Sequence, residues 1–370
     1  MTQTLDQFEH RMAAHCESGT VSALLRHAGL ELSEPMVFGG AGAIFFGYFN
    51  TAMLPFPTVV LRSLPGRIRA NVEKRTGVHF RRQRFLSSTN ARRQLDALLE
   101  RGIPVAVQVD FFYMRYIPKY ARAHFNAHYV IVVGHRDGRY LISDSYAPQI
   151  AELEAEVLTT ARFAKGPFSP HGLMFYIDGP IPTAFDQRAM IRKGIRQASF
   201  YMLKLPFSFA GIKGIRYFAD QVTKWPALTR DEEHLSHEVM MVHVVLEERG
   251  TGGGGGRFLY ASFLKEAADL LGHDGLRDVS ARMMLNGDRW RDISLFVARI
   301  GRSRDLGAPR LRELAELIRE RAAEEETLFR ELRAISATLS SPESIVAVAK
   351  VCFARTVLVT LICVWAAAAT

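Results

Sequence analysis

The stretch Ala14-His15-Cys16-Glu17-Ser18-Gly19-Thr20 decides the predicted fold, because it places a thiol in the first turn of a helix. Apolar residues follow Cys16 with the spacing of one helix face, and Gly29 is a typical residue for ending such a helix. The positive end of a helix and a nearby imidazolium both favour thiolate over thiol, and a thiolate is the nucleophile that acyl transfer requires. We therefore expect Cys16 to be a nucleophile. The apolar face comprises Val21, Leu24, Leu25 and Ala28.

A predicted β-hairpin supplies partners for this thiol. Residues 129–133 form an apolar, β-branched run, Asp137-Gly138 marks a turn, and residues 140–143 resume as a strand. His128 would begin one strand and Asp144 would end its neighbour, so the carboxylate can orient the imidazole. A lone Cys or a strand-end His is weak evidence, but this joint placement favours a catalytic set of Cys16, His128 and Asp144.

The composition is that of an ordinary globular protein, with 370 residues of which 48% are hydrophobic and 23% are charged. This length suits one large domain or two of common size, and we expect two. The net charge of +9 favours an acidic partner at modest salt. No zinc-finger spacing, ribonucleoprotein box or basic zipper is present, so we expect no nucleic acid. The basic residues 62–84 are either a solvated face or a docking surface for an acidic carrier protein.

The cysteine pattern and the chain ends bear on the compartment. Cys16, Cys352 and Cys363 do not suggest a disulfide framework, and the first residues lack a secretory signal pattern, so a cytoplasmic location is expected. The apolar residues 356–369 follow Lys350 and Arg355 and fall short of the roughly 20 residues that span a bilayer. Packing on the body is favoured for this tail, while a homodimer contact and a loose membrane association stay open.

The first predicted domain, residues 5–180, mixes helices and strands around this site. A helix is expected over residues 90–99 and a strand over residues 104–110. The glycine-rich residues 38–47 lack the full spacing of a phosphate-binding loop. These glycines let the backbone pass close to another segment or to a ligand's narrow arm, so Gly40 and Gly42 are candidate substrate contacts.

An aromatic segment between the predicted strand and His128 suggests the wall of a binding cleft. Asp110 leads into it, either holding the amine of an acceptor or capping nearby backbone N–H groups. His124 lies close by and is interpreted as a capping or packing residue. The candidate substrate-binding aromatics are Phe112, Tyr113 and Tyr116.

The second predicted domain, residues 183–340, is nearly all helix, and residues 341–370 form the apolar tail. His234, His237 and His243 lack metal-ligand spacing and a cysteine companion, so no metal site is expected. The five glycines 252–256 precede a predicted helix. A flexible linker and an anion-binding turn at the helix N-terminus are both open interpretations.

Several of these stretches resemble the N-terminal domain of the butirosin biosynthesis protein H family. They are residues 15–18, residues 24–30 with Ser33-Glu34, residues 38–40, Asp110 with its aromatic neighbours, and residues 128–134. The second region, through residues 251–258 and 261–268, is similar to the uncharacterised helical domain that commonly follows it. Most of the chain apart from the tail is covered.

The resemblance implies an α+β, papain-like cysteine-peptidase fold, with a nucleophile helix packed on an antiparallel sheet. A mostly helical domain would follow it along the chain. It also implies an acyltransferase of secondary-metabolite or lipid biosynthesis. An acyl or aminoacyl group would pass from the phosphopantetheine thioester of an acyl carrier protein to a small-molecule amine, with no permanently bound cofactor. Cys16, His128 and Asp144 match the nucleophile, base and orienting carboxylate of such folds.

One position departs from the papain-like pattern. Such enzymes often carry a Gln six residues before the nucleophile as an oxyanion donor, and His10 stands there in this chain. His10 is therefore a candidate oxyanion donor, with the imidazole or the Cys16 backbone N–H as alternatives. Two other functions stay open, namely a cysteine peptidase or amidase and a catalytically idle binding partner in a biosynthetic cluster.

Overall fold

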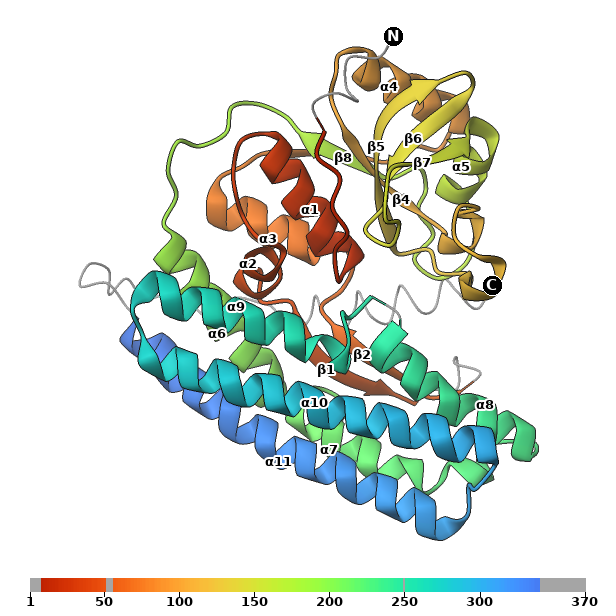
Figure 1. Cartoon of the computed structure of the whole chain (residues 1–370), viewed down its shortest axis with the longest axis vertical. Helices are drawn as coiled ribbons and strands as arrows, with labels where there is room; N and C mark the ends of the chain where they lie inside the picture. Colours follow the sequence, from red (N-terminus) through yellow and green to blue (C-terminus); the bar gives the residue numbers. More distant parts are fainter. Residues whose placement is uncertain (1–7, 51–55, 249, 340–370) are drawn as a thin grey trace. The chain divides into compact units, whose positions relative to one another are not determined.

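The computed structural model describes residues 8–50, 56–248 and 250–339 (Figure 1). The predicted tail, with Cys352 and Cys363, lies outside these residues. The described chain divides into two compact units. The first contains the residues up to Leu32 together with Val78–Thr183, and the second contains Ser33–Gly77 together with the residues from Ala184 onward.

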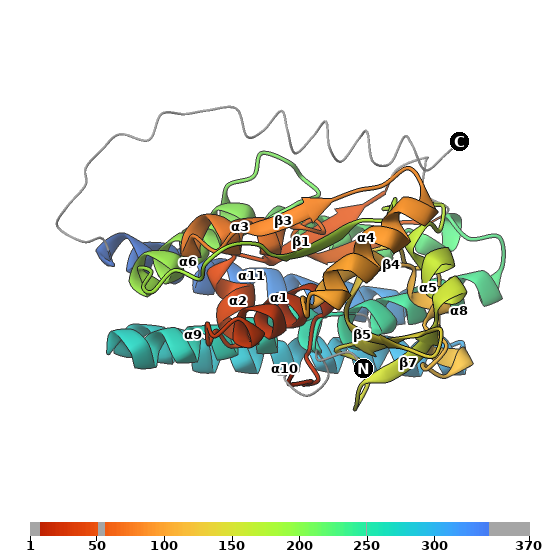
Figure 2. The same cartoon turned by 90° about the horizontal axis from the view of Figure 1, so that it is seen from above.

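The first unit contains a six-stranded antiparallel sheet in the strand order β3-β8-β4-β5-β6-β7. Helix α1 contacts β5 and β8, whereas α4 and α5 contact β4 and β5 or β6 (Figures 1 and 2). The strands are β3 (Phe80–Gln83), β4 (Val105–Val109), β5 (His128–Arg136), β6 (Arg139–Ser143), β7 (Ala151–Glu154) and β8 (Met174–Ile177), and the helices are α1 (Cys16–His27), α4 (Ser88–Glu100) and α5 (Ala155–Arg162).

Local sequence signals explain these elements. The β5–β6 hairpin reverses at Asp137 and Gly138, whose φ angles of 50° and 76° give the twist that a two-residue hairpin turn requires. Gly29, with φ of 87°, follows the end of α1. Strand β4 is buried at every residue, as expected for a strand covered on both faces. The predicted α+β architecture, with the Cys16 helix packed on an antiparallel sheet, is confirmed.

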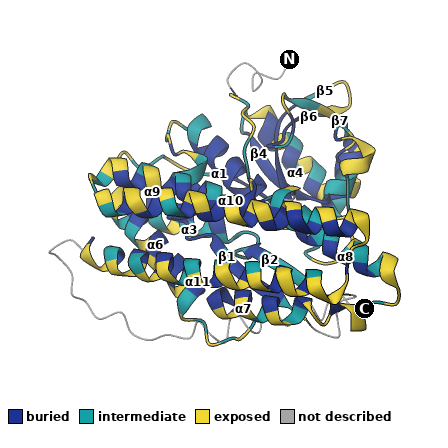
Figure 3. Cartoon of the chain, turned by 60° about the horizontal axis from the view of Figure 1, so that its bottom comes forward, coloured by how far each residue is buried: buried dark blue, intermediate teal, exposed yellow. Residues whose placement is uncertain are grey.

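The second unit is mostly helical but also contains a two-stranded antiparallel sheet. Helices α9, α10 and α11 lie side by side, and α10 and α11 each bury one face and expose the other (Figures 1 and 3). The elements are α2 (Glu34–Gly40), β1 (Ile44–Phe49), β2 (Thr58–Arg62), α3 (Arg67–Thr76), α6 (Gln187–Leu203), α7 (Gly211–Val222), α8 (Glu232–His243), α9 (Arg257–Leu271), α10 (Asp274–Ser303) and α11 (Ala308–Thr338).

The grouping of residues 33–77 with the helical unit differs from the continuous first domain that the sequence predicted. Its physical reason is the glycine surface of α2. A Cβ atom at Gly39 would lie 2.0 Å from the ring of Phe263 on α9, and one at Gly40 would lie 2.5 Å from Met190 on α6. Only glycine permits helices to pack this closely, so α2 belongs with α6 and α9.

The five-glycine segment is an ordered turn in front of α9. All five glycines, 252–256, have positive φ, and Gly254, Gly255 and Gly256 are buried. The Gly254 N–H donates to the Glu247 carboxylate at 2.9 Å, and Arg291 contacts the same group at 3.2 Å. The turn is therefore held in place by Glu247, which differs from a flexible linker.

A buried ion pair lies directly behind this turn. Arg257 and Glu325 are both fully buried and joined by two hydrogen bonds of 2.8 and 2.9 Å. Asn286 and Trp290 donate to the same Glu325 oxygen at 3.0 and 2.6 Å, and the Arg257 guanidinium also donates to the Gly255 carbonyl at 2.7 Å. This network ties the glycine turn, α9, α10 and α11 together.

Two absences concern the described residues alone. None of the helices among them is long and apolar enough to cross a bilayer. No group of three or more His, Cys, Asp or Glu side chains in the same part of the chain could hold a metal ion. His243, one of the three histidines considered for a metal, instead hydrogen-bonds Ser294 at 2.7 Å.

We predict that Glu325→Ala destabilises the second unit by about 3–5 kcal/mol, because it leaves the buried Arg257 charge unpaired. Urea unfolding followed by helix circular dichroism measures this. Glu320→Ala on the same helix is the matched control, since that carboxylate is 63% exposed and its ion pair with Arg321 spans 3.7 Å. An exposed pair of this kind contributes about 0–1 kcal/mol. Equal effects of the two substitutions would contradict the prediction.

Candidate active site

Cys16 is the first residue of α1 and is 2% exposed. The side chain of His15 caps the helix by accepting the Ser18 N–H at 3.1 Å, and the Cys16 sulfur lies 3.9 Å from the Ala127 carbonyl oxygen. A Cβ atom at Gly19 would lie 2.3 Å from that of Ala13. The missing side chain at Gly19 thus lets the first turns of α1 pack closely on the preceding segment, with the thiol beside the start of β5.

His128 and Asp144 form a fully buried pair. Their side chains are 3% and 0% exposed, and Nε2 of the ring donates to Oδ2 of the carboxylate at 2.9 Å. The Cys16 side chain also helps to raise the pKa of this ring. Since Nε2 is committed to Asp144, Nδ1 is the nitrogen left for the thiol.

The electrostatics of this pair favour an imidazolium. Burial alone lowers the pKa of His128, but the Asp144 carboxylate and Cys16 raise it to about 10. Burial alone raises the pKa of Asp144, but the charge and hydrogen bond of His128 bring it below its ordinary value. His128 is therefore protonated at neutral pH, and Asp144 is a carboxylate.

Two further donors hold Asp144. The phenol of Tyr116 donates to Oδ2 at 2.7 Å, and the Tyr146 N–H donates to Oδ1 at 3.0 Å. Burial and the neighbouring carboxylate hold the pKa of Tyr116 well above its ordinary value, so its hydroxyl stays a donor. The sequence made Tyr116 a candidate cleft residue, but the structure places it on the carboxylate instead.

Two aromatic rings flank the His128 imidazole, and neither was among the site residues expected from the sequence. Phe111 lies edge-on to it at 4.9 Å between ring centres, and Tyr146 lies edge-on at 6.0 Å. These rings fix the plane of the imidazole. The available signals were the position of Phe111 in the aromatic segment and that of Tyr146 directly after the Ser143-Asp144-Ser145 stretch.

The contacts of His10 differ from those expected of the oxyanion donor that the sequence suggested. One ring nitrogen, Nδ1, lies 2.8 Å from the Ser143 hydroxyl, and Nε2 lies 2.9 Å from the Ala147 carbonyl oxygen. Because both nitrogens already have partners, no donor is left for a substrate oxygen. His10 instead ties the segment before α1 to the loop that carries Asp144.

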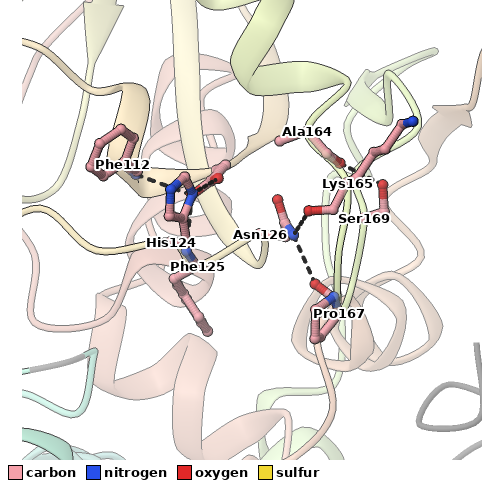
Figure 4. A network of polar contacts seen from close by, with 9 residues as sticks. Phe112, His124, Phe125, Asn126, Ala164, Lys165, Pro167 and Ser169 are labelled. Atoms are coloured by element: carbon pink, nitrogen blue, oxygen red, sulfur yellow. Dashed lines mark hydrogen bonds and ion pairs between the residues drawn. The ribbon is translucent and has the colours of Figure 1, made fainter. Parts of the chain in front are cut away.

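The contacts of Asp110 also differ from those expected if it bound the amine of an acceptor. Its carboxylate is 1% exposed, and Oδ1 accepts the N–H groups of Phe112 and Phe125 at 3.1 and 2.9 Å. Its Oδ2 accepts from Nδ1 of His124 at 2.7 Å, and the His124 ring stacks on Phe112 at 4.2 Å (Figure 4). Both oxygens are therefore occupied, as in the capping alternative.

The remaining sequence candidates have structural partners. Tyr113 packs edge-on against Phe112 at 5.6 Å between ring centres, in the short 3-10 helix η2 (Phe111–Tyr113). Gly40 and Gly42 belong to the second unit, where they pack on Met190 and Gln197. These two glycines therefore allow close packing between segments, which was the first of their two interpretations, and they are not carried into the proposed site.

Comparison with known proteins identifies the two regions of the chain. A family model described as "Butirosin biosynthesis protein H, N-terminal" matches residues 15–145. The N-terminal region belongs to this butirosin biosynthesis protein H family. A second model, described as "Domain of unknown function (DUF4872)", matches residues 156–332. Both matches agree with the resemblance drawn from the sequence, and the first spans Cys16, His128 and Asp144.

Other comparisons add little. Among solved structures, a protein from Bacillus anthracis assigned as a C39-like peptidase matches with 12% identity and a TM-score of 0.34. That match covers 48% of this chain and 98% of the other. No curated protein matches the chain. The match to the butirosin biosynthesis protein H family, together with the geometry of Cys16, His128 and Asp144, fits a cysteine-dependent enzyme that acts in biosynthesis.

We predict that Asp144→Asn makes His128 lose its proton at lower pH. With the carboxylate charge gone, burial dominates, so at about pH 8 the ring is protonated in the native protein and neutral in the variant. Nitrogen-15 NMR of the labelled ring measures this. The exposed His171 is the internal control, because its ring signals should be the same in the native protein and in the variant.

The same shift predicts a pH dependence of stability. The folded-state pKa of His128, about 10, lies above its ordinary value of 6.5. The pairing of protonated His128 with Asp144 therefore stabilises the folded protein fully below about pH 6.5, and this stabilisation is lost as the pH rises through about 10. Asp144→Asn should remove this loss between pH 7 and about 10. An unchanged alkaline profile of unfolding free energy would count against the proposed charge pair.

Proposed function

We propose that this protein is a cysteine-dependent acyltransferase, in which Cys16 accepts an acyl or aminoacyl group from a carrier-protein thioester and passes it to an amine. The observation that carries the proposal is the buried arrangement of Cys16 at a helix N-terminus with His128 and Asp144. Family membership supports it, because the matched family is named for a biosynthetic protein. Cys16 is the proposed nucleophile, His128 the acid and base, and Asp144 the orienting group.

The first half of the reaction follows from the charge state of His128. The Cys16 thiolate attacks the thioester carbonyl, and the sulfur of the phosphopantetheine arm leaves as the tetrahedral intermediate collapses. The His128 imidazolium gives its proton to that leaving sulfur, which produces a free pantetheine thiol, an acyl-enzyme and a neutral imidazole. A thioester is exchanged for a thioester, so little net free energy is needed.

In the second half, an amine attacks the acyl-enzyme and forms an amide. Neutral His128 takes a proton from the attacking nitrogen as the carbon–sulfur bond breaks, which restores the thiolate and imidazolium. The oxyanion of each tetrahedral intermediate would be stabilised by the Cys16 backbone N–H at the helix N-terminus. Water in place of the amine would make the same protein a hydrolase, so acceptor choice separates the two functions.

A carrier protein is the proposed source of the acyl group. Carrier proteins of this kind are acidic, and Arg81, Arg82 and Arg84 are exposed at the edge strand β3 or just after it. Arg81 is 55% exposed and makes only a 3.5 Å ion pair with Asp178. These arginines are the proposed docking surface, because an exposed cluster of one sign attracts a partner of the other.

We predict that an acyl group is found on Cys16 after the protein is incubated with an acyl thioester. The acetyl thioester of N-acetylcysteamine and an acetylated carrier protein serve as donors, and intact-protein and peptide mass spectrometry locate the adduct. Cys16→Ala should form no adduct. Adding an amine should release acetyl-amine from the native protein.

The outcomes separate the alternatives. Release of acetate that is insensitive to added amines would identify a hydrolase. Absence of any adduct, together with alkylation of Cys16 no faster than that of a free cysteine model, would support a catalytically idle binding protein. Formation of acetyl-amine with Cys16→Ala at the native rate would rule out the proposed nucleophile.

A second prediction addresses the carrier protein. Replacing Arg81, Arg82 and Arg84 together by Gln should raise KM for the carrier-bound donor roughly tenfold at low ionic strength, because electrostatic attraction is lost. KM for the N-acetylcysteamine thioester should not change. Replacing Arg136 and Arg139 by Gln is the matched control in the same unit. An unchanged KM for the carrier-bound donor would remove β3 as a docking surface.

A further inference from the structure

A second aspartate–histidine pair lies in the first unit, outside the Cys16, His128 and Asp144 arrangement. Asp110 is buried, whereas the side chain of His124 is 65% exposed. The 2.7 Å hydrogen bond to the carboxylate uses Nδ1 of His124, so Nδ1 carries the proton of the neutral ring. Within the described part of the chain, Nε2 has no hydrogen-bond partner, and its lone pair is open to solvent.

The loop that carries His124 is held in place by buried polar side chains. Gln108 donates to the Asn126 and Phe168 carbonyls at 2.7 and 2.8 Å. Asn126 donates to the Lys165 and Pro167 carbonyls at 3.1 and 3.0 Å (Figure 4). These bonds hold the backbone two residues after His124, and the Asp110 carboxylate holds the ring itself.

This pair lies at the strand ends that also carry the proposed catalytic residues. Val109, directly before Asp110, pairs with His128 in the β4–β5 ladder. Ala127, whose carbonyl the Cys16 sulfur approaches at 3.9 Å, is only three residues after His124. Phe111 contacts the His128 ring and the next residue, Phe112, stacks on His124.

In the proposed reaction, the amine acceptor must lose two protons, and His128 removes only one of them. An alkylamine is an ammonium ion at neutral pH and cannot attack until it loses one proton, and the attack itself releases a second. His128 accepts the second, and it is buried with Nε2 on Asp144 and Cys16 beside it. A separate, exposed base would remove the first proton from an acceptor that arrives as the ammonium ion.

We propose that His124, positioned by Asp110, is this second base and deprotonates the ammonium form of the acceptor before it attacks the acyl-enzyme. The inference rests on the proposed acyltransferase function and assigns an aliphatic amine as the acceptor class. His124 is a catalytic residue in this proposal, and Asp110 is a positioning residue that fixes its tautomer.

The protons balance over the second half-reaction. The acceptor gives one proton to Nε2 of His124, which releases it to water. The free amine attacks the acyl carbonyl, the carbon–nitrogen bond forms and the carbon–sulfur bond breaks. Its second proton passes to His128, so the products are an amide and the Cys16 thiolate with the His128 imidazolium.

The experiment follows the decay of acetyl-Cys16, formed on the full chain with acetyl-N-acetylcysteamine, after addition of propylamine or methoxyamine. Propylamine is protonated at neutral pH, whereas methoxyamine is already a free base. His124→Asn keeps a donor for Asp110 but removes the basic nitrogen. It should slow the reaction with propylamine by about 100-fold, within the usual range of general-base catalysis, and leave that with methoxyamine unchanged.

The pH profile is the readout that a merely structural role would not move. The deficit of His124→Asn with propylamine should shrink as the pH rises, because more of the amine is free. The charged and titratable groups around His124 are Asp110, Tyr113 at 6.1 Å between ring centres, and Arg122 over the Phe112 ring. His171→Asn, at another exposed histidine of the same unit, is the matched control and should behave as the native protein.

Asp110→Asn gives a second, independent test. The Asn carbonyl can still accept the Phe112 and Phe125 N–H groups, while its amide donates to Nδ1 of His124 and shifts the ring proton to Nε2. Nitrogen-15 NMR should show this change of tautomer, and the propylamine reaction should slow as in His124→Asn. A shifted tautomer with native propylamine kinetics would overturn the proposal.

The remaining outcomes distinguish this proposal from the function on which it rests. Equal slowing with both amines, or no slowing with either, would overturn the role of His124 while leaving the acyltransferase in place. An acetyl-enzyme that reacts with water and with neither amine would also overturn it. Failure of the native protein to form acetyl-Cys16 would instead refute the proposed function itself.

Discussion

The buried carboxylate of Asp144 is the group on which the geometry of the first unit depends. An isolated ionised carboxylate in the interior is strongly unfavourable, so it must be met by donors. His128, Tyr116 and the Tyr146 N–H supply them from three separate segments. Satisfying this one charge therefore fixes the hairpin end, the aromatic segment and the imidazole at once. It also leaves Nδ1 of the ring as the nitrogen that is available to Cys16.

The second unit solves a similar problem with a different result. Arg257 and Glu325 are a buried pair whose remaining donors and acceptors are also satisfied, by Asn286, Trp290 and the Gly255 carbonyl. Every group of this network belongs to the protein, and neither charge has access to solvent. It specifies how the helices and the glycine turn fit together. In the first unit, the Asp144 charge instead acts on the His128 ring, whose pKa the Cys16 side chain also raises.

Sequence reasoning succeeded where the signal is local and failed where partners come from far away in the chain. The start of α1 at Cys16 and the Asp137-Gly138 reversal follow from backbone preferences of a few residues, so both could be predicted. Tyr116 is an aromatic residue in an aromatic segment, and nothing in its neighbours indicates that its hydroxyl meets Asp144. The sequence around Gly40 likewise does not indicate that this glycine packs against Met190. That contact forms only when residues 33–77 pack with the helical unit.

The two histidines of the first unit show how one residue type can serve two needs. His128 is buried, and Asp144 and Cys16 both act on the pKa of its ring, which suits the proposed transfer of a proton between sulfur and nitrogen inside the site. It is poorly suited to exchanging that proton with water. His124 is paired to a buried carboxylate by one nitrogen and exposed at the other. Forming an amide from an ammonium ion requires both kinds of transfer in each turnover. In hydrolysis the attacking water does not have to lose a proton before it attacks, so the second base that we propose would serve an amine acceptor and not water.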